Sequence, residues 1–298
     1  MTSSITRDAV GASEATKPLF LVAGADDSCM ASFRISPKKF AKSYKAKTKR
    51  LLGFGGLPTR PSPGTIHNLR VSARRFQAIA SLLPKKTRRS KEYRRFDLAV
   101  KSLLKVTSQT RDFDILADTL GPYTDALPSE LLGFVRNERS DAATLALPAM
   151  NALSNLSPPS IRPRDVDGKR LSRRLQRRID GRSRVVEQLL RVVVNDESKV
   201  QELHALRIEG KKLRYLLELT DEPRPALSVI SKWQDSLGRL HDLDVAMAFL
   251  QEKRWDFPKT EVLSRLQRSR HSGYTRFTKK SRNNSATENI AFAGLRMQ

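Results

Sequence analysis

A duplicated helical segment constrains the fold of this chain more than any other feature of its 298 residues. Residues Ile66–Phe76 align with Leu203–Leu213. An apolar residue, a histidine, an arginine and a pair of adjacent basic residues occur at the same positions in both segments. A second match follows in each half, where Arg111–Leu116 aligns with His241–Ala246. The two matches have similar offsets along the chain, which indicates one duplicated unit with a shortened connection.

Apolar residues recur with the period of an α-helix, and no region alternates apolar and polar residues as a β-hairpin does. The sequence therefore predicts an all-α protein. Two bundles of about four helices each, one for each copy of the repeat, are the simplest way to bury the amphipathic segments. The predicted helices are Pro37–Leu52, Thr65–Leu83, Lys91–Leu120 (long enough to contain a break), Ser129–Leu153, Arg170–Val194, Lys199–Thr220, Ala226–Lys253 and Pro258–Arg282.

Loops rich in proline and glycine divide these helices. The middle loop, at residues 157–168, is predicted to link a first helical bundle at residues 34–156 to a second at residues 169–282. Residues 1–33 are predicted to form a disordered leader, and residues 283–298 a flexible tail, because helical periodicity is lost in both.

The composition indicates a polyanionic partner in a reducing compartment. The chain has 56 Lys and Arg against 31 Asp and Glu, a net charge of +25, which by itself allows nucleic acid, an acidic membrane or another polyanion. Aromatic residues make up 6% of the chain, too few for a surface built to stack single-stranded bases. Cys29 is the only cysteine, which excludes an intrachain disulfide and a cysteine-rich zinc site. The longest apolar stretch near the start is too short for a membrane span, so no membrane insertion is expected.

Each copy of the repeated helix places a basic stripe beside an apolar one. Basic groups that recur once per turn suit a ligand whose negative charges also recur at short intervals. A basic flank of a helix is usually only a solvated surface. A surface without a binding role would, however, be expected to change in sequence between the two copies, whereas this one is basic in both. Arg75 and Lys212 project further round and are expected to be ordinary surface charges. The apolar stripes are Ile66, Leu69, Ala73, Phe76, Ala80 and Leu83, and Leu203, Leu206, Gly210, Leu213 and Leu217; the candidate binding residues beside them are His67, Arg70 and Arg74, and His204, Arg207, Lys211 and Arg214.

The helix before each repeated helix is also basic. If these helices pack side by side, their rows line a common groove whose like charges repel one another until an anion arrives. The further candidate binding residues from these rows are Lys42, Lys45 and Lys49 in the first half, and Arg174 and Arg177 in the second.

Two histidines, His67 and His204, occupy equivalent places near helix starts. Their roles stay open between bracing the helix start as a neutral group, contacting an anion as a protonated one, and binding a metal. No further ligands at zinc or di-iron spacing surround them, so no metal site is predicted.

The acidic pairs Asp112/Asp114 and Asp242/Asp244 have a spacing of two, which on a helix points the carboxylates to different sides. The favoured interpretation is that one aspartate of each pair caps a turn or holds an arginine in place. Metal binding and catalysis are the less favoured alternatives.

These motifs resemble those of the CHAD family, the conserved histidine α-helical domain. The similarity spans residues 34–282 and is carried by His67–Arg75, His204–Tyr215, Arg111–Asp114 and Leu237–Asp244. It implies two four-helix bundles related by a pseudo-twofold axis, with a basic cavity that binds inorganic polyphosphate and can direct proteins to polyphosphate granules. Gln77 and His241 differ from the residues that are common at these positions in the family. A contact to the ligand at these positions is therefore expected to be absent or to come from another residue. The binding residues implied by the resemblance are His67, Arg70, Arg74, His204, Arg207, Lys211 and Arg214.

The functional hypothesis is a non-catalytic polyphosphate-binding module, cytoplasmic and associated with granules, that needs no cofactor. Many relatives carry a triphosphate-processing domain ahead of this one, but no Glu-x-Glu-x-Lys motif is present here, so a stand-alone module is expected. One alternative is a nucleic-acid-binding protein, although the sequence contains no known nucleic-acid recognition motif. The other is an enzyme, either a metal-dependent phosphohydrolase or a phosphohistidine acceptor that uses His67 and His204.

Overall fold

The computed structural model describes residues 33–55, 60–221, 225–252 and 261–297. All regular secondary structure in these residues is helical, which confirms the prediction of an all-α protein. The α-helices are α1 (Pro37–Leu52), α2 (Pro63–Ala80), α3 (Lys85–Arg89), α4 (Lys91–Leu120), α5 (Ser129–Ser154), α6 (Gly168–Val193), α7 (Val200–Leu217), α8 (Pro225–Glu252) and α9 (Glu261–Met297), and the 3₁₀ helices are η1 (Gly121–Ala126) and η2 (Pro163–Asp165).

Most helix boundaries lie close to the predicted ones. α1 and α4 have the predicted ends, and α4 runs from Lys91 to Leu120 as one helix. α9 continues to Met297, beyond the predicted end at Arg282. No proline interrupts residues 283–297, so the backbone can continue its helical hydrogen bonds where the apolar periodicity ends.

The short helix α3 is not among the predicted elements. Its five residues are all polar, so it has no apolar periodicity from which a helix could be recognised. Ser90 separates it from α4 and starts that helix, because its Oγ accepts a hydrogen bond of 3.2 Å from the backbone N–H of Tyr93. α3 carries Arg88, whose charge acts on two arginines of α6.

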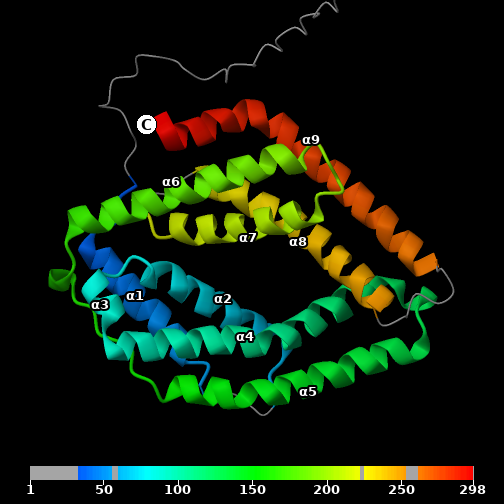
Figure 1. Cartoon of the computed structure of the whole chain (residues 1–298), viewed down its shortest axis with the longest axis horizontal. Coiled ribbons are helices and arrows are strands. Elements are labelled where there is room, and N and C mark those ends of the chain that lie inside the picture. Colours follow the sequence, from blue (N-terminus) through cyan, green and yellow to red (C-terminus); the bar gives the residue numbers. More distant parts are fainter. Residues whose placement is uncertain (1–32, 56–59, 222–224, 253–260, 298) are drawn as a thin grey trace, which may run out of the picture.

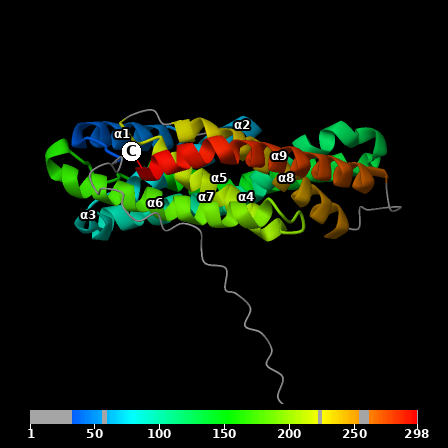
Figure 2. The ribbon, with the colours of Figure 1, turned by 90° about the horizontal axis from the view of Figure 1, so that it is seen from above.

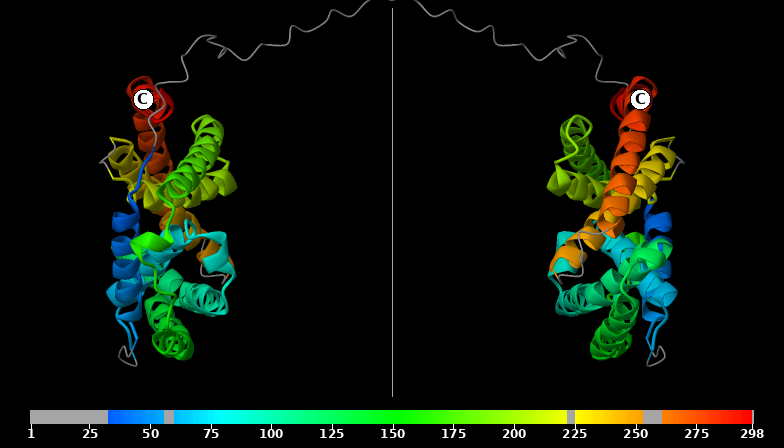
Figure 3. Two further views of the ribbon diagram at one scale, coloured as in Figure 1. Left: turned by 90° about the vertical axis from the view of Figure 1, so that its left-hand side faces the viewer. Right: turned by 90° about the vertical axis from the view of Figure 1, so that its right-hand side faces the viewer.

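The helices pack in the same order in both halves of the chain. α1 packs on α2, α2 on α4 and α4 on α5, while α6 packs on α7, α7 on α8 and α8 on α9. The first set fills the lower part of Figure 1 and the second the upper part, and the end views of Figure 3 show the same division. The sets meet where α2 contacts α7 and α4 contacts α8. Figure 2 shows that the whole arrangement is flat and elongated.

Both hydrophobic cores draw on both halves. The larger core includes Phe76 and Phe96 from the first half with Leu206 and Leu213 from the second. The smaller core lies where the ends of α4 and α8 meet the starts of α5 and α9. The loop at residues 157–168 therefore joins two sets of helices that share their buried surface, and the division into two separate bundles stays a prediction.

Phe33 ties the start of the described chain to the second half. It is 1% exposed, and its backbone N–H donates to Oε1 of Gln176 in α6 at 2.7 Å. The rest of the predicted leader, residues 1–32, lies outside the described residues. None of the helices in the described ranges combines the length and the apolar character needed to cross a membrane.

Candidate anion-binding site

The repeated helices α2 and α7 bury the apolar stripes that the sequence predicts. α2 begins after Ser62, whose Oγ accepts a hydrogen bond of 3.2 Å from the backbone N–H of Thr65, and Pro63 fits its first turn. Burial of the stripe sets the rotation of each helix and so turns the basic flank toward the other repeated helix. The buried residues include Ile66, Leu69, Ala73 and Phe76 on α2 and Leu203, Leu206, Gly210, Leu213 and Leu217 on α7.

A pocket of about 240 Å³ lies between these flanks, with α6 as its third wall. The uncharged part of the lining includes Gln77, Ala78 and Tyr215. No carboxylate lines the pocket among the described residues. The basic side chains that line it are Arg74, Arg178, Arg182, Arg207, Lys211 and Lys212.

Burial and like charge act together on Lys211. Desolvation, followed by the charges of Arg207 and Arg74, lowers the pKa of Lys211 to about 8, and Asp242 only partly opposes this effect. Burial is also the main reason why the pKa of Arg207 is lowered. Nη2 of Arg207 lies 3.8 Å from Oδ1 of Asp242, which makes a long ion pair. The protein therefore compensates the positive charge of this pocket only in part.

Arg70 is turned toward α4. Its Nη1 donates to the carbonyl oxygen of Leu104 at 2.6 Å and to Oγ1 of the fully buried Thr107 at 2.9 Å. Burial, followed by the charge of Arg74, lowers the pKa of Arg70 to about 10. Arg70 thus connects α2 to α4, while Arg74 carries the charge of α2 into the pocket.

The repeated histidine of α7 forms a pair with a histidine of α8. The Nδ1 atoms of His204 and His241 lie 3.0 Å apart, and their ring centroids 4.4 Å apart. Burial and the charge of Arg207 lower the pKa of His241 to about 3. Burial, with Arg207 and Lys211, also lowers the pKa of His204. Both rings are therefore neutral near pH 7.

The first half has an arginine where the second half has His241. Arg111 is the aligned residue. Burial is the largest cause of the lowered pKa of His67, and the charge of Arg111 is the second largest. Of the three roles considered for the histidines, this environment favours hydrogen bonding by a neutral ring. Within the described ranges, no group of three or more potential metal-ligating side chains is found.

The second aspartate of each acidic pair holds an arginine from the last helix of its half. Asp114 is 3% exposed and accepts a hydrogen bond of 2.8 Å from Nε of Arg139 in α5. Asp244 accepts a hydrogen bond from Nε of Arg270 in α9. The interpretation that one aspartate of each pair holds an arginine is confirmed.

The first aspartate of each pair lies near basic residues of the candidate site. Partial desolvation raises the pKa of Asp112, and the charges of Arg70, Arg111 and Arg207 oppose that rise. Arg207 therefore lies near the aspartate of the other half as well as near Asp242 of its own half.

On α6, three arginines at successive turns form one row. Arg178 and Arg182 line the pocket, and burial followed by the charge of Arg88 lowers the pKa of both Arg174 and Arg178. Arg177 is exposed and does not line the pocket. The sequence did carry a signal for this row, because Arg174, Arg178 and Arg182 each directly precede a buried residue of α6.

The three lysines selected on α1 lie outside the pocket. Lys42, Lys45 and Lys49 are exposed, and none of them lines it. Two other lysines of α1 face the second half: Lys39, whose Nζ lies 3.4 Å from Oδ1 of Asp221, and Lys47, whose pKa is lowered by burial while Glu218 opposes the shift.

Glu218 also corrects the expectation for Arg75, which is not an ordinary surface charge. Arg75 donates to both carboxylate oxygens of Glu218, at 3.0 and 3.2 Å, and so joins α2 to the end of α7. Nε of Arg214 lies 3.9 Å from the same carboxylate, and Arg214 does not line the pocket. Lys212 does line it, and its Nζ donates to Glu209 at 2.8 Å.

Comparisons with known proteins agree with this architecture. The CHAD domain model matches residues 58–251. The crystal structure of the CHAD domain from the plant Ricinus communis superposes with a TM-score of 0.50 at 19% sequence identity, covering 91% of this chain and 95% of that one, a likeness that shows the fold. No curated protein matches the sequence. The family model covers well over half of the chain, and the chain therefore belongs to the CHAD domain family.

Proposed function

We propose that this protein binds inorganic polyphosphate, without converting it chemically, in the pocket between α2, α6 and α7. The observation that carries the proposal is the lining of this pocket, where basic side chains from three helices converge and no carboxylate of the described residues enters. Membership of the CHAD family, which is associated with polyphosphate binding, supports it.

The electrostatics of the pocket favour a bound anion. Holding Arg74, Arg207 and Lys211 close together costs free energy, and the lowered pKa of Lys211 reflects that cost. A phosphate chain offsets the repulsion and accepts charge-assisted hydrogen bonds from each guanidinium and ammonium group. A polymer fits better than one phosphate, because the cations are spread over three helices.

The row on α6 extends beyond the pocket. Arg174 lies one turn before Arg178, and Arg88 of α3 acts on both residues. A chain long enough to leave the pocket would meet these charges too. We therefore expect affinity to rise with polymer length and to fall steeply with salt, as it does for other polyanions.

We also infer that the fold is a duplicated four-helix unit with pseudo-twofold symmetry. The pairs α1/α6, α2/α7, α4/α8 and α5/α9 correspond in sequence order, and two of these pairs, α2/α7 and α4/α8, contact each other between the halves. The ion pairs Asp114–Arg139 and Asp244–Arg270 recur in the two halves, which supports the same inference.

Cytoplasmic placement and association with polyphosphate granules are part of this proposal and follow from the proposed ligand. Nucleic acid is the alternative partner, since a phosphodiester chain also presents regular negative charge. Competition at equal phosphate concentration separates the two, because polyphosphate must displace duplex DNA at moderate salt. Release of phosphate from polyphosphate would instead indicate the phosphohydrolase alternative.

A charge-matched pair of variants tests the site. The pocket variant carries Arg74→Gln, Arg178→Gln and Lys211→Gln, and the control carries Lys42→Gln, Lys45→Gln and Lys49→Gln. Each loses three positive charges, so their long-range attraction for a polyanion falls by a similar amount. We expect a loss of affinity of about 100-fold for the pocket variant, since charged hydrogen bonds are lost, and about threefold or less for the control.

Circular dichroism of both variants checks that the helices are intact. Equal losses of affinity in the two variants would contradict the proposal, because they would show attraction by net charge rather than by the pocket. Undiminished binding in the pocket variant would contradict it as well.

A further inference from the structure

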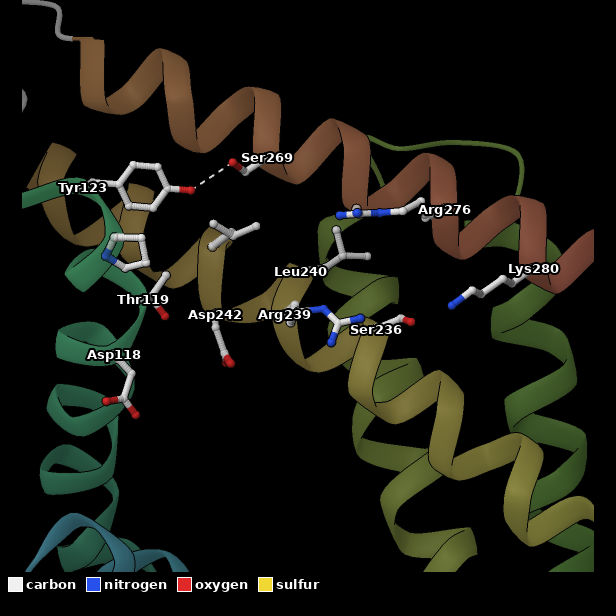
Figure 4. Close-up of a pocket in the computed structure, with 13 residues that line it drawn as sticks. Asp118, Thr119, Tyr123, Ser236, Arg239, Leu240, Asp242, Ser269, Arg276 and Lys280 are labelled. Atoms are coloured by element: carbon white, nitrogen blue, oxygen red, sulfur yellow. Dashed lines mark hydrogen bonds between the residues drawn. The ribbon is translucent and has the colours of Figure 1, made fainter. Parts of the chain in front are cut away.

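A second and larger pocket lies where α8 and α9 meet η1 and the end of α4 (Figure 4). Its volume of about 640 Å³ is in the range of small-molecule sites. It shares no lining residue with the basic pocket. The two are adjacent through one contact, because Asp242 lines the larger pocket and lies 3.8 Å from Arg207, which lines the basic one.

One end of this pocket is basic. Arg239 of α8 and Arg276 and Lys280 of α9 line it, and Figure 4 shows them on the side away from Asp118. Arg276 and Lys280 are one turn apart, so they present their charges from the same face of α9. All three side chains are exposed, and none forms an ion pair or a hydrogen bond with the described part of the chain. They are therefore available to an anionic group, and their geometry suits phosphate.

The other end carries an acceptor and an aromatic ring. Asp118 is exposed and forms no ion pair within the described ranges. The hydroxyl of Tyr123 shares a hydrogen bond of 2.9 Å with Oγ of Ser269, drawn in Figure 4. The guanidinium carbon of Arg265 lies 5.4 Å from the centroid of the same ring. Both contacts fix the ring of Tyr123 at the rim of the pocket.

The separation of charge argues against a second stretch of polyphosphate. The carboxylates of Asp118 and Asp242 would repel a chain that is negative along its whole length. A molecule with one phosphate end and one flat end rich in N–H and O–H donors satisfies both ends, because aspartate accepts from amino and hydroxyl groups and tyrosine contacts an aromatic base.

We propose that this pocket binds a nucleotide, with its phosphate at Arg239, Arg276 and Lys280 and its base and ribose toward Asp118 and Tyr123. The site is independent of the polyphosphate site, since the two pockets have different lining residues. Asp242 lies between the two, so the protein can hold both ligands at once.

Isothermal titration calorimetry with ADP on the full chain tests this proposal. We expect one ADP per chain, and binding at least tenfold weaker in the Arg276→Gln/Lys280→Gln variant. The control Arg268→Gln/Lys279→Gln removes the same charges from exposed positions of α9 outside the pocket and should stay within twofold of the wild type. The Asp118→Asn variant should weaken ADP binding several-fold and leave pyrophosphate binding unchanged.

The pocket variant of the polyphosphate site locates the bound ADP. If the proposal is correct, the Arg74→Gln/Arg178→Gln/Lys211→Gln chain binds ADP with unchanged affinity. Loss of ADP binding in that chain would place ADP in the basic pocket and overturn the proposal. Absence of ADP binding to the wild type, equal losses in the two α9 variants, or pyrophosphate binding as tight as ADP binding would also overturn it, and none of these results bears on whether polyphosphate binds.

Discussion

The Nδ1 atoms of His204 and His241 lie 3.0 Å apart and join α7 to α8. A hydrogen bond between them needs one protonated and one unprotonated Nδ1, which two neutral rings provide. Burial and the nearby charge of Arg207 oppose an additional proton, so the pKa of His241 falls to about 3. The folded state therefore excludes a proton that the unfolded chain accepts.

We expect stability to fall as the pH drops from 6.5 toward 3. In that range His241 is protonated in the unfolded chain and neutral in the folded one, so the unfolded state binds more protons. One such group lowers the free energy of unfolding by at most about 1.4 kcal/mol per pH unit. Urea unfolding at pH 7, 6 and 5 measures the slope.

The His241→Gln variant should show a shallower slope than the wild type, because glutamine does not titrate. His271→Gln serves as the comparison, since it removes a histidine outside this pair, one whose Nδ1 lies 2.8 Å from Oε2 of Glu197. A slope that His241→Gln leaves unchanged would show that the histidine pair does not couple folding to pH.

Lys211→Met should stabilise the protein without ligand and weaken polyphosphate binding. The pKa of Lys211 is lowered to about 8, so at pH 7 its ammonium group is held in the folded state at a cost, which disappears as the pH rises above 8. Removing the charge should raise the free energy of unfolding by on the order of 1–3 kcal/mol. Urea denaturation with and without polyphosphate tests both effects. An unchanged free energy of unfolding in the variant without ligand would contradict the destabilising repulsion in this pocket. Lys42→Met on the exposed face of α1 is the control.

Polyphosphate affinity should fall as the pH rises from 7.5 to 9.5. A bound anion raises the pKa of Lys211 from its value of about 8, so binding above that pH takes up a proton. The loss approaches tenfold per pH unit for one such group. Lys211→Arg keeps its charge throughout this range and should remove most of the pH dependence. If Lys211→Arg retains the wild-type pH profile, another group is responsible.

Arg139→Ala should destabilise the fold by about 3 kcal/mol. Asp114 is 3% exposed, and loss of its 2.8 Å partner leaves the buried carboxylate with only Arg111, whose Nη1 lies 3.9 Å away. The double variant Arg139→Ala/Asp114→Ala should recover part of this loss, because it removes the buried charge as well. Urea unfolding of the single and double variants measures the coupling, and a loss below about 1 kcal/mol in the single variant would show that Arg139 is not the main compensation of Asp114.

Local patterns were sufficient to predict the helices and their buried faces. The stripes of Ile66, Leu69 and Ala73 on α2 and of Leu206 and Leu213 on α7 are buried as predicted, because the helical period sets which side chains share a face. Sequence patterns were less informative at α3, which has no apolar residue, and at the end of α9, where helix continues without apolar periodicity.

Which arginines converge was decided by packing. Arg177 and Arg178 are neighbours on α6, and Arg178 lines the pocket together with Arg74 of α2, while Arg177 is exposed. Packing of α1 likewise determines that Lys47 is partly buried near Glu218, whereas Lys45 is exposed.

The sequence by itself determined that this protein is helical, internally repeated and strongly basic on the flanks of its repeated helices, because helical period and charge are local properties of the chain. Only the tertiary structure decided which of those charges meet. Arg74, Arg178 and Lys211 come from three helices in both halves of the chain, and their repulsion exists only after the hydrophobic core has brought these helices together.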